Sequence, residues 1–145
     1  MNRDLKFRAW DKIENIMHYQ ENGNEGVEFS FGGINCVKVY EYKPQLVDGV
    51  CIDDWDYEEL EDVEIMQYTG LRDKNGKEIY ESDIIQTDVN LKKWIVYEED
   101  YAWYVKNIGS NEKYPLGVYK KLISVASSKL EVIGNIYQNK NLLNI

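Results

Sequence analysis

The sequence has few of the residues that usually build catalytic and metal centres. Among its 145 residues are one histidine, two cysteines and two prolines. Because His18 has no second histidine and no CxxC pair beside it, we expect a satisfied imidazole, at the surface or half-buried, rather than a zinc ligand or general base. Cys36 and Cys51 also lie in no metal-binding spacing, which favours two buried free thiols over a disulfide.

Long apolar segments and a signal peptide are missing as well. Together with the cysteine pattern, this predicts a soluble cytoplasmic protein without membrane attachment. A chain of 145 residues can form one domain or two small subdomains without disulfide staples. Twelve tyrosines and four tryptophans indicate an ordered chain that is rich in strands.

Acidic residues are concentrated in the first half of the chain. Residues 1–70 hold 16 acidic and 6 basic residues, whereas residues 71–145 hold 10 and 11. Eight of the acids fall in the segment DDWDYEELEDVE, residues 53–64. Since binding to phosphates requires Lys and Arg, direct binding of nucleic acid is not expected.

Alternation of apolar and polar residues predicts strands in the first half. A strand over residues 5–10, a turn over 11–15 and a returning strand over 16–20 form a first hairpin. Further short strands are expected between residues 27 and 42, interrupted at Gly32-Gly33. The acidic segment 53–64 is the one helix candidate, with one or two turns, although repulsion among its carboxylates weakens a helix.

The second half reads as a series of short strands. They are expected over residues 83–89, 94–97, 101–105, 117–123 and 129–137. Tyr97, Tyr101, Trp103 and Tyr104 could stack nucleic-acid bases, but their place in a hairpin favours core and cross-strand packing. The predicted fold is mainly β, with a β-hairpin subdomain over residues 1–64 and a small, partly open SH3-like β-barrel over residues 65–145.

The strongest turn signal is Asn75-Gly76, between two apolar runs. A two-residue loop would place like charges opposite each other twice, whereas a three-residue loop with a left-handed Gly76 pairs opposite charges. The register then pairs Asp73 with Lys77, Arg72 with Glu78, Leu71 with Ile79, and Gly70 with Tyr80. Nothing in this register requires a ligand, so we interpret the hairpin as scaffold.

Three stretches, KFRAWDKIENIM, MQYTGLRDKNGKEIYESDII and EVIGNIYQNKNLL, resemble the YopX-like family of small phage and prophage proteins. The motif residues, interpreted as structural, are Tyr68, Gly70, Leu71, Asp73, Asn75, Gly76, Ile79, Tyr80, Asp83, Gly134 and Tyr137. Ser82 stands where the family usually has glycine, and a left-handed backbone there would cost about 1 kcal/mol. Lys140 stands where the family usually has proline. Without proline, a rigid and extended backbone is not expected at this position of the C-terminal tail. The resemblance implies a mainly β fold in the cytoplasm of a bacterial host, and it supplies no catalytic residues and no cofactor.

Three functional hypotheses follow, and none assigns a catalytic or metal-binding residue. The first is a non-catalytic adaptor that binds a host or phage protein, with Asp53, Asp54, Trp55, Asp56, Tyr57, Glu58 and Glu59 as candidate partner-binding residues. The second is an acidic nucleic-acid mimic, and the third is a carboxylate-metal hydrolase. The acidic segment lacks the glycine of a calcium loop. Self-association through exposed strand edges stays open.

Overall fold

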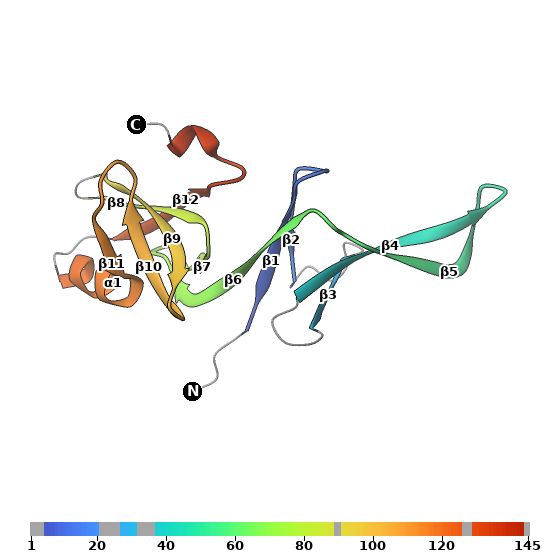
Figure 1. Cartoon of the computed structure of the whole chain (residues 1–145), viewed down its shortest axis with the longest axis horizontal. Coiled ribbons are helices and arrows are strands. Elements are labelled where there is room, and N and C mark those ends of the chain that lie inside the picture. Colours follow the sequence, from blue (N-terminus) through green and yellow to red (C-terminus); the bar gives the residue numbers. More distant parts are fainter. Residues whose placement is uncertain (1–4, 21–26, 32–36, 89–90, 126–128, 144–145) are drawn as a thin grey trace. The chain divides into compact units, whose positions relative to one another are not determined.

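The computed structural model describes residues 5–20, 27–31, 37–88, 91–125 and 129–143. It is mainly β, which confirms the predicted fold class. The chain divides into two compact units (Figure 1): an N-terminal unit, Lys6–Met66, and a C-terminal unit, Met1–Leu5 with Gln67–Ile145. Each unit has its own hydrophobic core and is described separately below.

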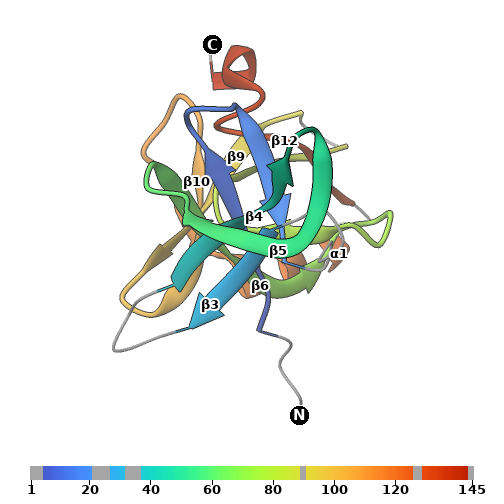
Figure 2. The same ribbon diagram turned by 90° about the vertical axis from the view of Figure 1, so that its right-hand side faces the viewer.

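The N-terminal unit is built from antiparallel strands. They are β1 (Phe7–Asp11), β2 (Ile16–Tyr19), β3 (Val27–Phe31), β4 (Val37–Val47), β5 (Val50–Glu59) and the start of β6 (Val63–Arg72). In one sheet β1 lies between β2 and the start of β6, and the other sheet has the order β3-β4-β5, whose strands are labelled in Figure 2. The core contains Ala9, Val27, Phe29 and Val39. Because strand side chains alternate, Val27 and Phe29 are buried while Glu28 and Ser30 are exposed.

The first hairpin forms as the sequence predicts. β1 and β2 pair antiparallel, with Trp10 opposite Met17. Asp11 closes the turn, since its Oδ1 accepts hydrogen bonds from the amides of Ile13 (2.9 Å) and Glu14 (3.1 Å). Asn15 has a left-handed φ of 57°, a conformation that asparagine tolerates well.

The helix expected in the acidic segment is wrong, because residues 50–59 form strand β5. β5 pairs with β4, and the pairing places Lys43 opposite Asp56. A helix would have brought the carboxylates of residues three and four positions apart together, whereas successive residues of a strand point to opposite faces of the sheet. Asp48 and Gly49 form the connecting turn with φ values of 52° and 78°, which both central positions of a type I′ turn require.

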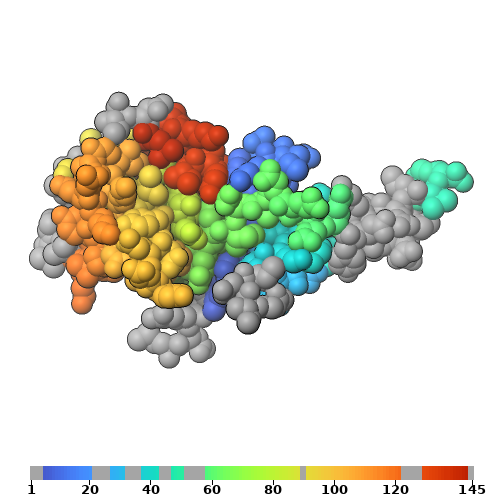
Figure 3. All heavy atoms as spheres, in the orientation of Figure 1, coloured from blue at the N-terminus to red at the C-terminus, as the bar shows by residue number. Residues whose placement is uncertain are grey.

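Some expectations fall outside what the structure describes. The side chains of residues 43–46 and 51–57 are not described, and neither is Cys36. The expectation of two free thiols therefore stays a prediction. In Figure 3 the apex of the β4–β5 ribbon, residues 47–50, stands clear of the other described residues of the N-terminal unit.

The C-terminal unit is a curled five-stranded sheet (Figure 1). Its strands, in order across the sheet, are β11 (Lys113–Pro115), β10 (Ala102–Asn107), β9 (Lys93–Glu99), β8 (Asp83–Thr87) and β12 (Leu130–Asn135). Its core contains Ile85, Trp94, Val96, Val105, Leu116 and Leu130. The sheet curls into a half barrel, and the more specific SH3-like assignment stays a prediction. The unit also contains β7 (Glu78–Tyr80), α1 (Leu116–Val125) and the 3₁₀ helix η1 (Lys140–Leu143).

The strand expected over residues 117–123 is wrong, because these residues belong to helix α1. Leu116 and Tyr119 are buried, while Gly117 and Val118 between them are exposed. A spacing of three positions brings side chains to one face of a helix but to opposite faces of a strand. The helix therefore buries the pair against the sheet.

The hairpin between β6 and β7 has the predicted three-residue loop. The amide of Gly76 donates to the carbonyl of Asp73 (3.0 Å), and Gly76 has a φ of 79°. Arg72 lies opposite Glu78, as predicted. The register beyond this pair is wrong, because Tyr80 pairs with Tyr68 rather than with Gly70.

The correction arises from a bulge in β6. Gly70 has a φ of 85°, so glycine serves the backbone of the bulge rather than leaving space for a ring. The bulge shifts the register and brings Tyr68 opposite Tyr80, with ring centroids 5.6 Å apart. Thr69 secures the irregular stretch, since its hydroxyl donates to the carbonyl of Ile79 (2.7 Å).

The turn between β7 and β8 contains Ser82, the residue that stands where the family usually has glycine. Ser82 has a left-handed φ of 70°, the conformation that the family's usual glycine adopts freely. Its amide donates to the carbonyl of Val96 (2.8 Å). Asp83 closes the turn by accepting a hydrogen bond from the amide of Tyr80 (2.8 Å). Near the end of the chain, Lys140 begins the 3₁₀ helix η1, so the exit at this position is helical rather than extended.

Candidate functional site

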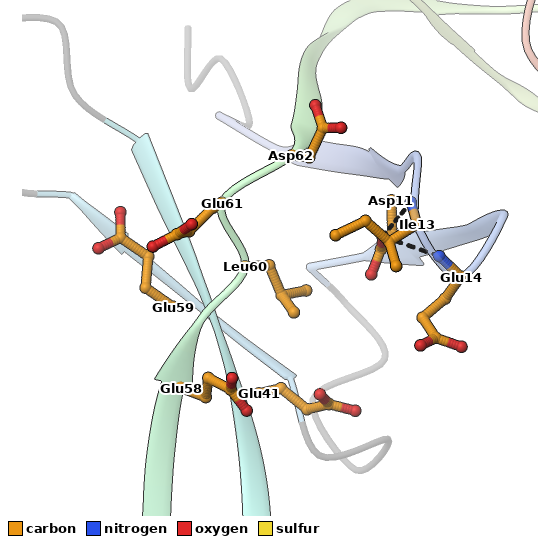
Figure 4. Close-up of a pocket in the computed structure, with 9 residues that line it drawn as sticks. All are labelled: Asp11, Ile13, Glu14, Glu41, Glu58, Glu59, Leu60, Glu61 and Asp62. Carbon is orange, nitrogen blue, oxygen red and sulfur yellow. Dashed lines mark hydrogen bonds between the residues drawn. The ribbon is translucent and has the colours of Figure 1, made fainter.

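A concave surface lined mainly by acidic residues lies in the N-terminal unit, and we call it the acidic hollow (Figure 4). It encloses about 500 Å³. Seven of the nine residues that line it carry carboxylates, and the other two are isoleucine and leucine. The lining residues are Asp11, Ile13, Glu14, Glu41, Glu58, Glu59, Leu60, Glu61 and Asp62.

Three segments that are distant in sequence form the hollow. The turn after β1 supplies one side, and Glu41 and Glu58, which are partners in the β4–β5 register, supply another. The link between β5 and β6 completes the lining. Backbone hydrogen bonds fix this link, from the amide of Leu60 to the carbonyl of Val39 (2.8 Å) and from the amide of Lys12 to the carbonyl of Asp62 (3.0 Å).

Two lysines offset part of the negative charge. The Nζ of Lys12 lies 2.7 Å from a carboxylate oxygen of Glu64 and 3.7 Å from one of Asp62. The Nζ of Lys38 lies 3.4 Å from Glu59. These pairs are partly exposed, so each contributes little to stability. Over residues 6–66 the chain has 15 acidic and 5 basic residues, and the hollow keeps a negative field.

The hollow also offers apolar surface between its carboxylates. Ile13 is 70% exposed, so most of its side chain is accessible to a partner. Leu60 is half-buried and packs against the core of the N-terminal unit. In Figure 4 the side chains of Ile13 and Leu60 both extend into the hollow. The site can therefore contact an aliphatic chain and a positive charge at the same time.

Carboxylates that are buried have structural roles. Asp11, Asp73 and Asp83 are each less than a tenth exposed, and each accepts hydrogen bonds from backbone amides in a turn. The Nε2 of His18 lies 3.8 Å from Asp11, and His18 is partly buried as expected. Within the described ranges, no group of three His, Cys, Asp or Glu side chains is arranged to hold a metal ion.

The structure divides the candidate partner-binding residues. Glu58 and Glu59 line the acidic hollow, while residues 53–57 continue along β5 with side chains that are not described. Sequence reasoning missed Asp11, Ile13, Glu14, Glu41, Glu61 and Asp62. A prediction that Glu41 lies opposite Glu58 would have brought two of the three segments together. That prediction requires the register between β4 and β5.

The motif residues near the end of the chain form a turn network. The Oδ1 of Asn135 accepts hydrogen bonds from the amides of Tyr137 (3.0 Å) and Gln138 (2.9 Å). The Oδ1 of Asn139 accepts one from the amide of Asn135 (3.1 Å). A Cβ on Gly134 would lie 2.4 Å from that Asn139 oxygen, so the network requires glycine.

The aromatic residues around β9 and β10 have different environments. Tyr97 and Tyr104 are cross-strand partners with ring centroids 5.9 Å apart, and Trp103 packs against the core. Tyr101 is fully exposed at the turn. A hydrogen bond from Lys113 lowers the pKa of the Glu99 carboxyl, and burial raises the pKa of Tyr97.

The fold and the hollow define a mainly β protein with an acidic N-terminal unit and a half-barrel C-terminal unit. The YopX protein family matches residues 6–144, and the chain belongs to this family. None of the helices in the described part of the chain has the length and apolar character needed to cross a membrane.

Two solved structures resemble the whole chain. The crystal structure of protein EF1440 from Enterococcus faecalis is 26% identical with a TM-score of 0.64, and the match covers 99% of this chain and 100% of that one. The structure of YopX from Bacillus subtilis is 20% identical with a TM-score of 0.61, over 94% of this chain and 96% of that one. Among curated proteins, none matches the sequence.

Proposed function

We propose that this protein is a non-catalytic adaptor, encoded by a phage or prophage, that binds a basic protein in the cytoplasm of a bacterial host. The observation that carries the proposal is the acidic hollow, in which seven carboxylates surround the side chains of Ile13 and Leu60. Membership of the YopX family, together with the resemblance noted in the sequence, supports the phage setting.

Lysine and arginine side chains suit this surface. Their aliphatic stems can pack on Ile13 and Leu60, while their charged groups reach the surrounding carboxylates. The net negative charge of the N-terminal unit would also attract a basic partner from a distance, since complementary fields raise association rates. Both effects weaken as salt screens the charges.

The shape of the site favours an adaptor over a nucleic-acid mimic. A mimic of duplex DNA must present its carboxylates along a face that a DNA-binding protein can surround. Here the carboxylates themselves surround a hollow that contains two apolar side chains. Such a surface fits protruding side chains of a protein partner better than a groove built for phosphates.

The test is capture of partners from host lysate by the purified protein and by two variants with matched charge changes. In the hollow variant, glutamine replaces Glu58, Glu59 and Glu61. In the control variant, glutamine replaces Glu98, Glu99 and Glu112 of the C-terminal unit. Circular dichroism and thermal unfolding first establish that both variants fold. Bound proteins are identified by mass spectrometry at low and high salt.

We expect the hollow variant to lose a basic partner that the wild type and the control variant retain. High salt should weaken capture by the wild type because the attraction is electrostatic. Equal capture by all three proteins would contradict the proposal. A partner that DNA displaces would instead favour the mimic, and turnover of a captured molecule would contradict the non-catalytic assignment.

A further inference from the structure

Among the described residues, strand β5 pairs with a neighbouring strand on one side only, and we call its other side the free edge. It is the last strand in the sheet β3-β4-β5, so β4 is its one neighbour within the described sheet. An unpaired edge exposes backbone amides and carbonyls that can hydrogen-bond to an added strand. Ten residues of strand are about 33 Å long, whereas the commonest strands have about five or six residues.

The register determines which backbone groups point to the free edge. The amide of Leu60 donates to the carbonyl of Val39 at 2.8 Å, so Leu60 and Val39 form a hydrogen-bonded pair. Hydrogen-bonded and non-hydrogen-bonded pairs alternate along an antiparallel ladder. Glu41 with Glu58 is therefore hydrogen-bonded, whereas Tyr40 with Glu59 is not.

The same alternation continues along the ribbon. Tyr42 with Tyr57 and Pro44 with Trp55 are non-hydrogen-bonded pairs, and proline suits such a position because it has no amide to donate. In these pairs the backbone groups point away from the partner strand. The amides and carbonyls of Trp55, Tyr57 and Glu59 thus point to the free edge of β5.

The charge of β5 selects what can pair with it. The strand VCIDDWDYEE contains five acidic residues and no basic residue. A second copy of β5 at this edge would place acids opposite acids, and like charges on facing strands are destabilising. A strand that carries lysine or arginine would place opposite charges across the new pair. The edge therefore favours a basic segment over another copy of this chain.

We propose that an extended segment rich in lysine and arginine, belonging to the protein partner, adds to β5 as a fourth strand. This inference rests on the proposed function and specifies its binding mode. Glu59 connects the two surfaces, because its backbone groups point to the free edge and its side chain lines the acidic hollow. Backbone hydrogen bonds supply affinity in strand addition, and the carboxylates supply the preference for basic residues.

The test uses a synthetic eight-residue peptide of alternating lysine and threonine, and a control peptide in which glutamate replaces lysine. Amide hydrogen exchange of the full-length protein is measured by nuclear magnetic resonance with each peptide. We expect the lysine peptide to slow exchange of the amides of Trp55, Tyr57 and Glu59 by about tenfold or more. The amides of Asp56 and Glu58, already paired with β4, should change little.

A second peptide separates strand addition from simple charge attraction. The same lysine peptide, N-methylated at every residue, keeps its charges but has no amide to donate on either edge, so it cannot form the ladder. It should bind about tenfold or more weakly than the parent peptide. Equal binding of the two peptides would overturn strand addition, as would binding of the parent peptide without slower exchange at Trp55, Tyr57 and Glu59.

A pair of variants tests the same edge from the protein side. Tyr57→Pro removes an amide that points to the free edge, whereas Tyr57→Thr shortens the side chain and keeps the amide. The lysine peptide should bind Tyr57→Thr nearly as well as wild type and Tyr57→Pro about tenfold more weakly. If Tyr57→Pro does not fold, the N-methylated peptide still distinguishes strand addition from charge attraction.

The outcomes distinguish this inference from the proposed function. The lysine peptide could bind in a way that requires the acidic hollow but not the amides of the peptide. That result would overturn strand addition, and it would still support a basic protein partner. No binding of the lysine peptide at about 1 mM would overturn both, because neither the edge nor the hollow would then recognise basic residues.

Discussion

The carboxylate of Asp73 accepts a hydrogen bond from the amide of Val132 at 2.9 Å, although the two residues are 59 positions apart. Its other oxygen accepts hydrogen bonds from the amides of Asn75 and Lys77, both at 2.9 Å. One buried side chain thus shapes the β6–β7 loop and attaches it to β12. The motif aspartate is a structural residue of the C-terminal unit.

We expect Asp73→Asn to destabilise the protein by about 2 kcal/mol or more. The substitution replaces one acceptor oxygen by an amino group that faces a backbone amide, which leaves two buried donors unpaired. Urea unfolding followed by circular dichroism measures the change. The exposed Glu112→Gln serves as control and should change stability by less than about 0.5 kcal/mol. A similar small change in both variants would contradict the structural role.

Ser82→Gly should stabilise the protein by about 0.5–1 kcal/mol. Glycine adopts the left-handed φ of 70° without the steric cost that serine has, and this gain exceeds the larger entropy of glycine in the unfolded chain. Ser30→Gly in the ordinary strand geometry of β3 is the matched control and should destabilise. Destabilisation by Ser82→Gly, measured by thermal unfolding, would mean that the serine side chain contributes more than the backbone strain costs.

Gly134→Ala should destabilise by about 1–3 kcal/mol. The new Cβ would lie 2.4 Å from the Oδ1 of Asn139, and moving that side chain breaks its hydrogen bond with the amide of Asn135. A double-mutant cycle with Asn139→Ala tests this cause. In the Asn139→Ala background the cost of Gly134→Ala should fall by about half or more. An unchanged cost of Gly134→Ala would show that the new Cβ does not destabilise the protein through the Asn139 side chain.

Tyr119 should make the protein less stable in strong alkali. Burial raises the pKa of Tyr119 to about 12, while a tyrosine in the unfolded chain titrates near 10. Below pH 10 the hydroxyl is protonated in both states. Between about pH 10 and pH 12 the unfolded state loses the proton first, so stability falls as pH rises.

The comparison with Tyr119→Phe isolates this titration. Wild type should lose up to about 1 kcal/mol more than the variant between pH 9 and pH 11, because phenylalanine cannot ionise. Urea unfolding at the two pH values gives the difference. An equal loss of stability in both proteins would show that the hydroxyl of Tyr119 titrates alike in the folded and unfolded states.

Local signals in the sequence predicted the parts of the fold that depend on neighbouring residues. The three-residue loop at Gly76 and the hairpin of β1 and β2 follow from turn chemistry and alternation. The helix α1 was missed, because its buried Leu116 and Tyr119 lie three positions apart in a stretch that also reads as a strand. Short apolar segments do not distinguish the two by periodicity alone.

The acidic hollow could be predicted only in part. Composition identified the acidic segment, and two of its candidate residues, Glu58 and Glu59, do line the hollow. The turn after β1 supplies Asp11, Ile13 and Glu14, which approach the segment only through the fold. No local pattern marks such a meeting of distant segments. The strand β5 was misread for the same reason, since its pairing with β4 depends on a partner earlier in the chain.

The pairing of β8 with β12 has a consequence for synthesis on the ribosome. Every strand that lies wholly within the N-terminal unit is complete once Met66 has left the ribosome, whereas β8 must wait until β12 follows more than forty positions later. Translation adds roughly 5–20 residues per second, so the edge of β8 stays open for several seconds. During this interval a chaperone or a neighbouring chain has access to an edge of β8 that the folded C-terminal unit covers with β12.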